Sequence, residues 1–253
     1  MLTFDYPHRK AFDAAKAHAR AEFPKESCGL IIDGEYVPCT NAAEDPTKDF
    51  FIAPQEMQRY LSSNIEMIVH SHPGGPYFPS KADMEGQARS AVPWAIIVLD
   101  DERIADTPVI WGTDVPLLPI LGRPFVHGVA DCYSLVRDTF RLGKDKLAEQ
   151  GIEWPYEPID LYDLPRDDNW WTLGDNFYVD HYAKQGFREI PMEEARPGDA
   201  FLIKIRSSIC NHAGVLIGGD QIIHHLPMRM SRREPAGIWG RAAEMWLRYE
   251  GNA

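Results

Sequence analysis

The stretch HSHPGGPYFPSKAD, residues 70–83, places two histidines and an aspartate where a predicted strand gives way to a predicted helix. Residues 65–72 read as the strand, and because side chains alternate along a strand, His70 and His72 share one face. Imidazole is a preferred zinc ligand, and Asp83, one turn into the helix, can supply a third. Three protein ligands leave a fourth position for water, the arrangement of a catalytic zinc ion. The spacing therefore makes these three residues candidate zinc ligands.

A zinc-bound water also needs a base, and Glu26 is the candidate because it directly precedes the apolar run SCGLII. Each of these residues has an ordinary structural interpretation as well. An isolated His-x-His is often a pair of surface histidines. Ser80 and Asp83 together can be a helix N-cap with a favourable acid in the first turn. Glu26 alone can be a solvated carboxylate.

The complete spacing resembles the JAMM (MPN-type) metalloprotease motif. The match covers five positions, which are His70, Ser71, His72, Ser80 and Asp83. The resemblance implies that the two histidines and the aspartate bind zinc, that Glu26 is the general base, and that Ser80 helps to hold the tetrahedral intermediate. These roles are physically sensible, because a metal can activate the attacking water and a hydrogen-bond donor can stabilise the developing oxyanion. Glu22 is a nearby competitor for the role of Glu26.

Around this motif, strands and helices mix in a unit of about a hundred residues. We expect helices at 8–22, 54–63 and 80–90, and strands at 28–32, 35–38, 50–53, 65–72 and 94–100. The stretch GTDVPLLPILG, residues 112–122, breaks this rhythm with two prolines and two glycines. We therefore predict a first domain at 1–113, a linker at 114–122 and a second domain at 123–253.

The second domain is expected to begin with a helix and to continue as an antiparallel β-meander. The helix spans 131–144, an irregular insertion follows at 150–180, and strands are expected at 196–205, 212–218 and 221–226 with a tight GGD turn. This order predicts an α+β fold for the domain and for the chain. Trp154, Trp170 and Trp171 lie in the insertion, where a ligand-binding wall and a small satellite core are equally good interpretations.

A cysteine begins the predicted helix of the second domain. Asp131 is a plausible N-cap, so Cys132 lies in the first turn, where the helix dipole favours a thiolate. A thiolate nucleophile needs a histidine to move protons and a partner to orient that histidine. His212 and His224 stand at the ends of two strands that a hairpin brings together. From this spacing alone, a buried structural cysteine is the commoner outcome.

Three blocks of the second half resemble the NlpC-like cysteine peptidases of the papain-like group, which cut peptidoglycan stem peptides. They cover residues 122–138, 196–203 and 211–225, in the order of the family. The resemblance implies that Cys132 is the nucleophile, His212 the general base and His224 the orienting residue. The neighbouring His225 should point to the other strand face. Two departures, Phe125 where the family has tyrosine and Tyr133 where it has serine, leave room for an altered substrate choice.

Composition limits the other possibilities. The net charge of -12 argues against a nucleic-acid binder or a polybasic membrane-surface protein, and the longest apolar runs are too short to span a bilayer. The polar N-terminus predicts no signal peptide. Four cysteines without a pairing pattern favour a reduced, cytosolic setting, with Cys28, Cys39 and Cys210 as structural thiols.

A JAMM unit followed by an NlpC-like unit resembles the tail-tip assembly proteins of lambda-like phages. The resemblance implies two peptidase sites. It also implies that the partners are a peptidoglycan stem peptide and other tail-tip proteins. The expected location is the host bacterial cytoplasm during tail assembly, and the finished virion tail tip is left open as a second location. One alternative is an assembly factor or scaffold whose peptidase sites are idle. A weaker alternative makes the first domain a deubiquitinase-like enzyme.

Overall fold

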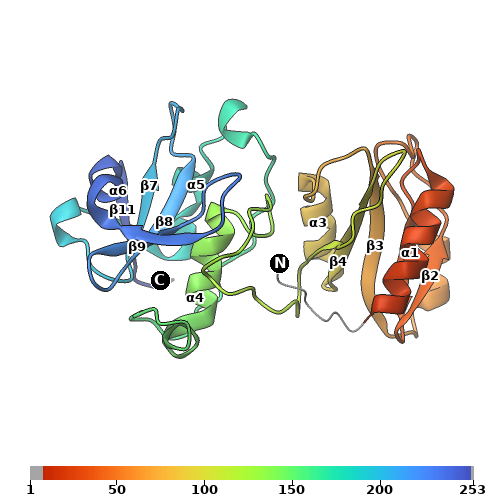
Figure 1. Ribbon diagram of the computed structural model, residues 1–253, viewed down its shortest axis with the longest axis horizontal. Helices are drawn as coiled ribbons and strands as arrows, with labels where there is room; N and C mark the ends of the chain where they lie inside the picture. Colours follow the sequence, from red (N-terminus) through yellow and green to blue (C-terminus); the bar gives the residue numbers. More distant parts are fainter. Residues whose placement is uncertain (1–7, 252–253) are drawn as a thin grey trace. The chain divides into compact units, whose positions relative to one another are not determined.

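The computed structural model describes residues 8–251, which divide into two compact units between Pro116 and Leu117 (Figure 1). Each unit combines helices with one sheet, so the predicted two-domain α+β class is confirmed. The division falls inside the predicted linker. The end of that segment is held by the second unit, because Ile120 is fully buried in its core and Arg123 donates to the backbone oxygens of Leu118 and Pro119.

The first unit is a five-stranded mixed sheet in the order β2-β1-β3-β4-β5. Only β3 and β4 run parallel, since helix α3 forms the crossover between them. The elements are α1 (Arg9–Glu22), β1 (Cys28–Ile32), β2 (Glu35–Cys39), α2 (Pro54–Met57), the 3-10 turn η1 (Gln58–Tyr60), β3 (Ile65–Pro73), α3 (Lys81–Ser90), β4 (Trp94–Leu99) and β5 (Val109–Trp111).

The two faces of this sheet serve different purposes. Helix α1 is amphipathic and packs its apolar face, including Phe12, against Met67 and Val69 of β3. Because side chains alternate along a strand, His70 and His72 point to the opposite face. Figure 1 shows α1 and α3 on opposite sides of this sheet, so both histidines face the side that carries α3.

Two expectations for the first unit are wrong in detail. The predicted strand at 50–53 is only an isolated bridge between Asn41 and Ile52, because the surrounding backbone bonds to the Asn41 side chain rather than to a neighbouring strand. The predicted helix at 54–63 is a single α-helical turn followed by a 3-10 turn. No residue of this short segment is buried, so packing does not extend the helix.

The second unit is an antiparallel six-stranded sheet in the order β10-β9-β8-β7-β11-β6, with α4 packed against β8. Its elements are α4 (Cys132–Ala148), η2 (Trp170–Thr172), α5 (Phe177–His181), η3 (Ala183–Gln185), β6 (Phe187–Ile190), η4 (Met192–Glu194), β7 (Ala200–Ile203), β8 (His212–Ile217), β9 (Gln221–His224), β10 (Arg232–Pro235), α6 (Ala236–Ala242) and β11 (Met245–Tyr249). The expected meander corresponds to β7, β8 and β9.

The predicted strand at 196–205 is shortened to β7. Its first residues form a turn instead, in which Asp199 accepts from the backbone of Arg196 and donates its own backbone N–H to the Arg196 carbonyl. The predicted helix at 131–144 corresponds to α4, which continues past a kink at Gly143 to Ala148. That glycine has φ +67°, and a Cβ there would lie 2.5 Å from the nitrogen of Pro158.

The insertion at 150–180 is mostly irregular, as predicted, but it contributes to the core. Trp154 and Trp170 are each 4% exposed and belong to the main cluster of the second unit, so the core interpretation holds for both, and Trp171 packs against the same cluster. Strands β5, β6, β10 and β11 and helices α5 and α6 were not expected from the sequence. None of the helices within residues 8–251 is both long and apolar enough to cross a bilayer.

Candidate functional sites

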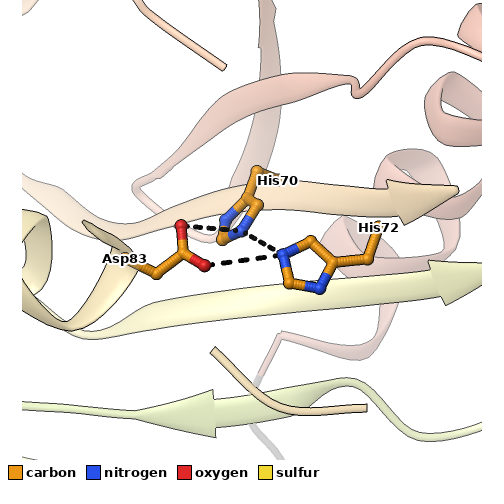
Figure 2. A group of neighbouring side chains, drawn as sticks. All are labelled: His70, His72 and Asp83. Atoms are coloured by element: carbon orange, nitrogen blue, oxygen red, sulfur yellow. Dashed lines mark hydrogen bonds and ion pairs between the residues drawn. The ribbon is translucent and has the colours of Figure 1, made fainter. Parts of the chain in front are cut away.

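His70, His72 and Asp83 meet in one buried cluster on the α3 side of the first sheet. Figure 2 shows both imidazoles of β3 turned toward the carboxylate of α3. The two Nε2 atoms are 3.1 Å apart, His70 Nε2 is 3.3 Å from Asp83 Oδ1, and His72 Nε2 is 3.5 Å from Asp83 Oδ2. Each of the three residues is at most 8% exposed to solvent. The expected juxtaposition is therefore present.

These three distances fit a tetrahedral metal. Zinc binds imidazole nitrogen and carboxylate oxygen at about 2.0–2.2 Å, so two ligand atoms at neighbouring corners of a tetrahedron lie about 3.3–3.5 Å apart. The His70, His72 and Asp83 atoms are already close to that separation. Their donor set, two nitrogens and one oxygen, is also one that zinc accepts.

The protonation states of His70 and Asp83 also fit a cation, whereas contacts with Asp83 and Pro76 outweigh burial and raise the pKa of His72. His72 Nδ1 donates to the Pro76 carbonyl at 3.0 Å, which leaves its Nε2 lone pair directed at the cluster. Burial lowers the pKa of His70, so this imidazole is neutral, as a ligand must be. Burial would raise the pKa of Asp83, but His70, His72 and Ser80 outweigh it and hold the pKa well below its usual range.

Ser80 caps α3 and holds the carboxylate of Asp83. Its hydroxyl accepts from the Asp83 backbone N–H at 3.1 Å and donates to Asp83 Oδ2 at 2.7 Å, and its own N–H donates to the same oxygen at 2.8 Å. The capping interpretation of Ser80 and Asp83 is thus correct, and it coexists with the cluster. The Ser80 hydroxyl is bonded to Asp83, so its clearest contribution is to orient that carboxylate.

Glu26 lies beside this cluster. Cys28 is directly opposite His70 in the β1–β3 ladder, and the Ser71 N–H donates to the Ser27 carbonyl, so Glu26 comes opposite His72 on the same face. The residue is only 7% exposed. Burial raises the pKa of Glu26 to about 7, with His72 opposing this change and Asp83 adding to it. A carboxylate with that pKa is suited to accept a proton near neutrality.

An aromatic wall around His70 escaped the sequence analysis. Phe50 stacks on the imidazole with ring centroids 4.4 Å apart, and Trp94 and Trp111 contact it edge-on at 5.8 and 6.4 Å. These rings fix the plane of His70 and exclude water from its buried side. They come from a loop and two strands far apart in sequence, so no local pattern indicated them.

In the second unit, Asp131 caps α4 directly before Cys132. Its carboxylate accepts from the backbone N–H groups of Ser134 at 2.9 Å and Gly128 at 2.8 Å, and it forms a buried ion pair with Arg166 of the insertion. The predicted N-cap is therefore present. The arginine, which the sequence analysis missed, ties the insertion to the start of the helix that carries the cysteine.

The sulfur of Cys132 lies 3.2 Å from the hydroxyl of Tyr178 on α5. Within residues 8–251 its hydrogen bonds involve this hydroxyl and the backbone of Ala213, and none joins it to His212. Ala213 directly follows His212 in β8, so the thiol and the histidine belong to one neighbourhood. The insertion thus supplies a hydroxyl to the cysteine, whereas Phe125 packs against the ring of His225.

Burial changes the expected ionisation of the cysteine. We expected the helix start to favour the thiolate, but burial and the charge of Asp131 raise the pKa of Cys132, although the bonds from Tyr178 and Ala213 act the other way. Burial also lowers the pKa of His212 to about 3. In the resting state the Cys132 thiol and the His212 imidazole are therefore both neutral.

The two histidines form a chain. His212 Nε2 lies 3.1 Å from His224 Nδ1, and His224 Nε2 lies 3.2 Å from Glu234 Oε2. The expected pairing is therefore present, and Glu234 extends it. Because β10 was not expected, the sequence analysis did not bring Glu234 to this site. His225 points elsewhere, as predicted, and donates to the Arg229 carbonyl.

Comparisons with known proteins agree with this division. The model of the prokaryotic homologs of the JAB domain matches residues 8–110, and that of the NlpC/P60 family matches residues 122–242. The probable TtuB-protein conjugate cleaving protease of Thermus thermophilus is 31% identical over 108 residues, which cover 39% of this chain and 72% of that protein.

Two phage proteins match both units. Tail tip assembly protein K of Escherichia phage N15 is 34% identical over 252 residues, covering 96% of this chain and 95% of that protein. Tail tip assembly protein K of Escherichia phage lambda is 34% identical over 185 residues, covering 72% and 81%. With JAB and NlpC/P60 domains in the same order as its two folded units, this chain belongs to the tail tip assembly protein K family.

Proposed function

We propose that this phage tail-tip protein is a peptidase with two independent centres, one a zinc site and the other a cysteine site. The observation that supports the proposal is the buried cluster of His70, His72 and Asp83 in the first unit, together with the paired histidines His212 and His224 in the second. The proposed domains are 1–113 and 123–253, joined by 114–122. The protein would act in the host bacterial cytoplasm during tail assembly, alongside other tail-tip proteins.

In the first domain, His70, His72 and Asp83 would hold zinc, which supplies Lewis acidity and lowers the pKa of a bound water towards about 7. Glu26 would take the proton of the attacking water and pass it to the leaving amine. Ser80 would keep the Asp83 carboxylate oriented, and a role for its hydroxyl at the tetrahedral intermediate remains part of the proposal. An amide or isopeptide bond is the proposed substrate, since the Thermus relative is named for cleaving protein conjugates.

In the second domain, the substrate would be an amide bond of a peptidoglycan stem peptide. The sulfur of Cys132 would attack the carbonyl carbon while its proton passes to His212, and His224 would orient that histidine. His212 would then protonate the leaving amine, and a thioester would remain on the sulfur. Water would hydrolyse the thioester and regenerate the thiol. A neutral resting pair implies that proton transfer accompanies attack rather than preceding it.

The cysteine centre is tested by digesting purified muropeptides with the full chain and with Cys132→Ala. We expect stem-peptide fragments from the wild type and none from the variant. A buried cysteine of the same unit offers a matched control, Cys210→Ala, which should retain cleavage. Equal cleavage by wild type and Cys132→Ala would refute this half of the proposal.

The zinc centre is tested by metal analysis of the full chain after dialysis against zinc. We expect one zinc per wild-type chain and little in a His70→Ala/His72→Ala variant. His18→Ala is the control, because His18 lies in the same unit but bonds to Tyr36 outside the cluster. Full metal retention in the double variant would remove the proposed site.

One observation favours the alternative of an assembly factor with an idle cysteine site. The sulfur bonds to Tyr178 rather than to His212, and burial raises its pKa. Phage complementation separates the two functions. If Cys132→Ala and His70→Ala variants support normal yields of infectious particles, the assembly role alone is sufficient.

A further inference from the structure

We infer that Glu234 is a positioning residue that sets the protonated nitrogen of both histidines in the cysteine centre, an inference that rests on the proposed cysteine peptidase. The strand register places the three side chains together. His224 lies opposite Gly214 of β8, two residues from His212, and opposite Arg232 of β10, two residues from Glu234. Because opposed residues share a face and side chains alternate, all three point to the same side.

The direction of each hydrogen bond follows from the carboxylate. An ionised carboxylate can only accept, so the 3.2 Å contact with Glu234 Oε2 requires a proton on His224 Nε2. A neutral imidazole carries one N–H, so His224 Nδ1 must be the acceptor in the 3.1 Å contact with His212 Nε2. His212 then carries its proton on Nε2, and its Nδ1 is left as an unprotonated base.

The other two protonation patterns conflict with the surroundings. With the proton on Nδ1, His224 would turn a lone pair toward the Glu234 carboxylate, and two acceptors would face each other at 3.2 Å. A doubly protonated His224 would donate to His212 Nε2 and force the proton of His212 onto Nδ1, which removes the base. Burial lowers the pKa of His224 despite the opposing charge of Glu234, and Arg232 and Arg229 act in the same direction as burial.

Glu234 is itself held in place as an acceptor. Trp239 Nε1 donates to the same Oε2 atom at 2.6 Å, and Arg232 pairs with Oε1 at 2.6 Å. The indole ring of Trp239 also lies 4.3 Å from the His224 ring, edge to face. Both carboxylate oxygens therefore have fixed donors, and His224 receives an acceptor of defined position.

The test combines histidine ¹⁵N NMR on the full chain with muropeptide kinetics. In the wild type we expect His224 and His212 to carry protons on Nε2 and lone pairs on Nδ1. In Glu234→Ala we expect mixed protonation of both rings and a kcat about tenfold lower at unchanged KM, since only a fraction of molecules presents the base. Glu234→Gln keeps an acceptor oxygen for His224 and Trp239, so it should recover most of the activity.

Two controls separate positioning from structural support. Glu250→Ala removes a carboxylate that pairs with Arg188 at the surface, and it should change neither readout. Trp239→Phe removes one donor to Glu234 but leaves the carboxylate, so the protonation pattern should persist. A Trp239→Phe variant that reproduces the loss seen in Glu234→Ala would overturn the inference.

The NMR readout stands apart from catalysis. A wild-type His224 protonated on Nδ1, or a Glu234→Ala variant with unchanged protonation, refutes the role of Glu234 even if muropeptides are cleaved. If the wild type cleaves no muropeptide but shows the expected Nε2 protons that Glu234→Ala loses, the positioning role is supported and the proposed substrate fails. If Glu234→Ala does not fold, a wild-type His224 that is protonated on Nδ1 would still refute the inference.

Discussion

Replacing Glu26 by glutamine should stabilise the metal-free first unit above neutral pH. The folded chain raises the pKa of Glu26 from 4.5 to about 7, mainly through burial, so it binds this proton more tightly than the unfolded chain does. The stability that this group contributes is therefore complete below about pH 4.5 and is lost as the pH rises through about 7. At about 1.36 kcal/mol per pH unit, the interval corresponds to about 3 kcal/mol.

Hydrogen exchange on the full chain in the presence of a chelator measures this difference. Amides of β1 and β3 report opening of the first unit, and those of β8 report the second unit. At pH 8, β3 amides of Glu26→Gln should exchange roughly 100-fold more slowly than in the wild type, and at pH 4 the two should agree. The exposed Glu44→Gln should behave as the wild type at both pH values.

Two results would contradict this reasoning. Equal exchange of wild type and Glu26→Gln at pH 8 would mean that the carboxylate is solvated, and faster exchange would mean that its charge is stabilised. Added zinc should reduce the difference, because a nearby cation favours the charged carboxylate. A residue that lowers the folding stability above neutral pH, as Glu26 does, is expected to be retained if its proton affinity serves catalysis.

Three further substitutions test the surrounding contacts. Ser80→Ala should cost about 1 kcal/mol through loss of the N-cap and weaken zinc binding about 10- to 100-fold in a chelator competition; unchanged affinity would deny that the hydroxyl orients the metal-binding aspartate. Arg166→Met should cost the second unit about 3–5 kcal/mol in thermal unfolding, because Asp131 keeps a buried charge without its partner. Tyr178→Phe should raise the pKa of the Cys132 thiol and slow its alkylation by iodoacetamide at pH 8, whereas faster alkylation would show that the hydroxyl only shields the sulfur.

Features that depend on neighbouring residues could be predicted from the sequence. The alternation of β3 directs His70 and His72 to one face, and the spacing from Ser80 to Asp83 sets a helix cap that also aims the carboxylate. The start of α4 at Cys132 follows from its N-cap in the same way. These contacts form within one or two turns of chain, so local geometry determines them.

Tertiary structure decided which charges and polar groups surround those residues. Glu22 has 45% of its side chain exposed while Glu26 is buried opposite His72, a distinction that only the β1–β3 register makes. Tyr178 reaches the cysteine centre from the insertion and lies 46 residues from Cys132 in the sequence. Glu234 reaches it from β10 and lies 10 residues from His224. The expectation of a thiolate failed for the same reason: desolvation depends on all the chain packed around an atom, which spacing along the sequence does not report.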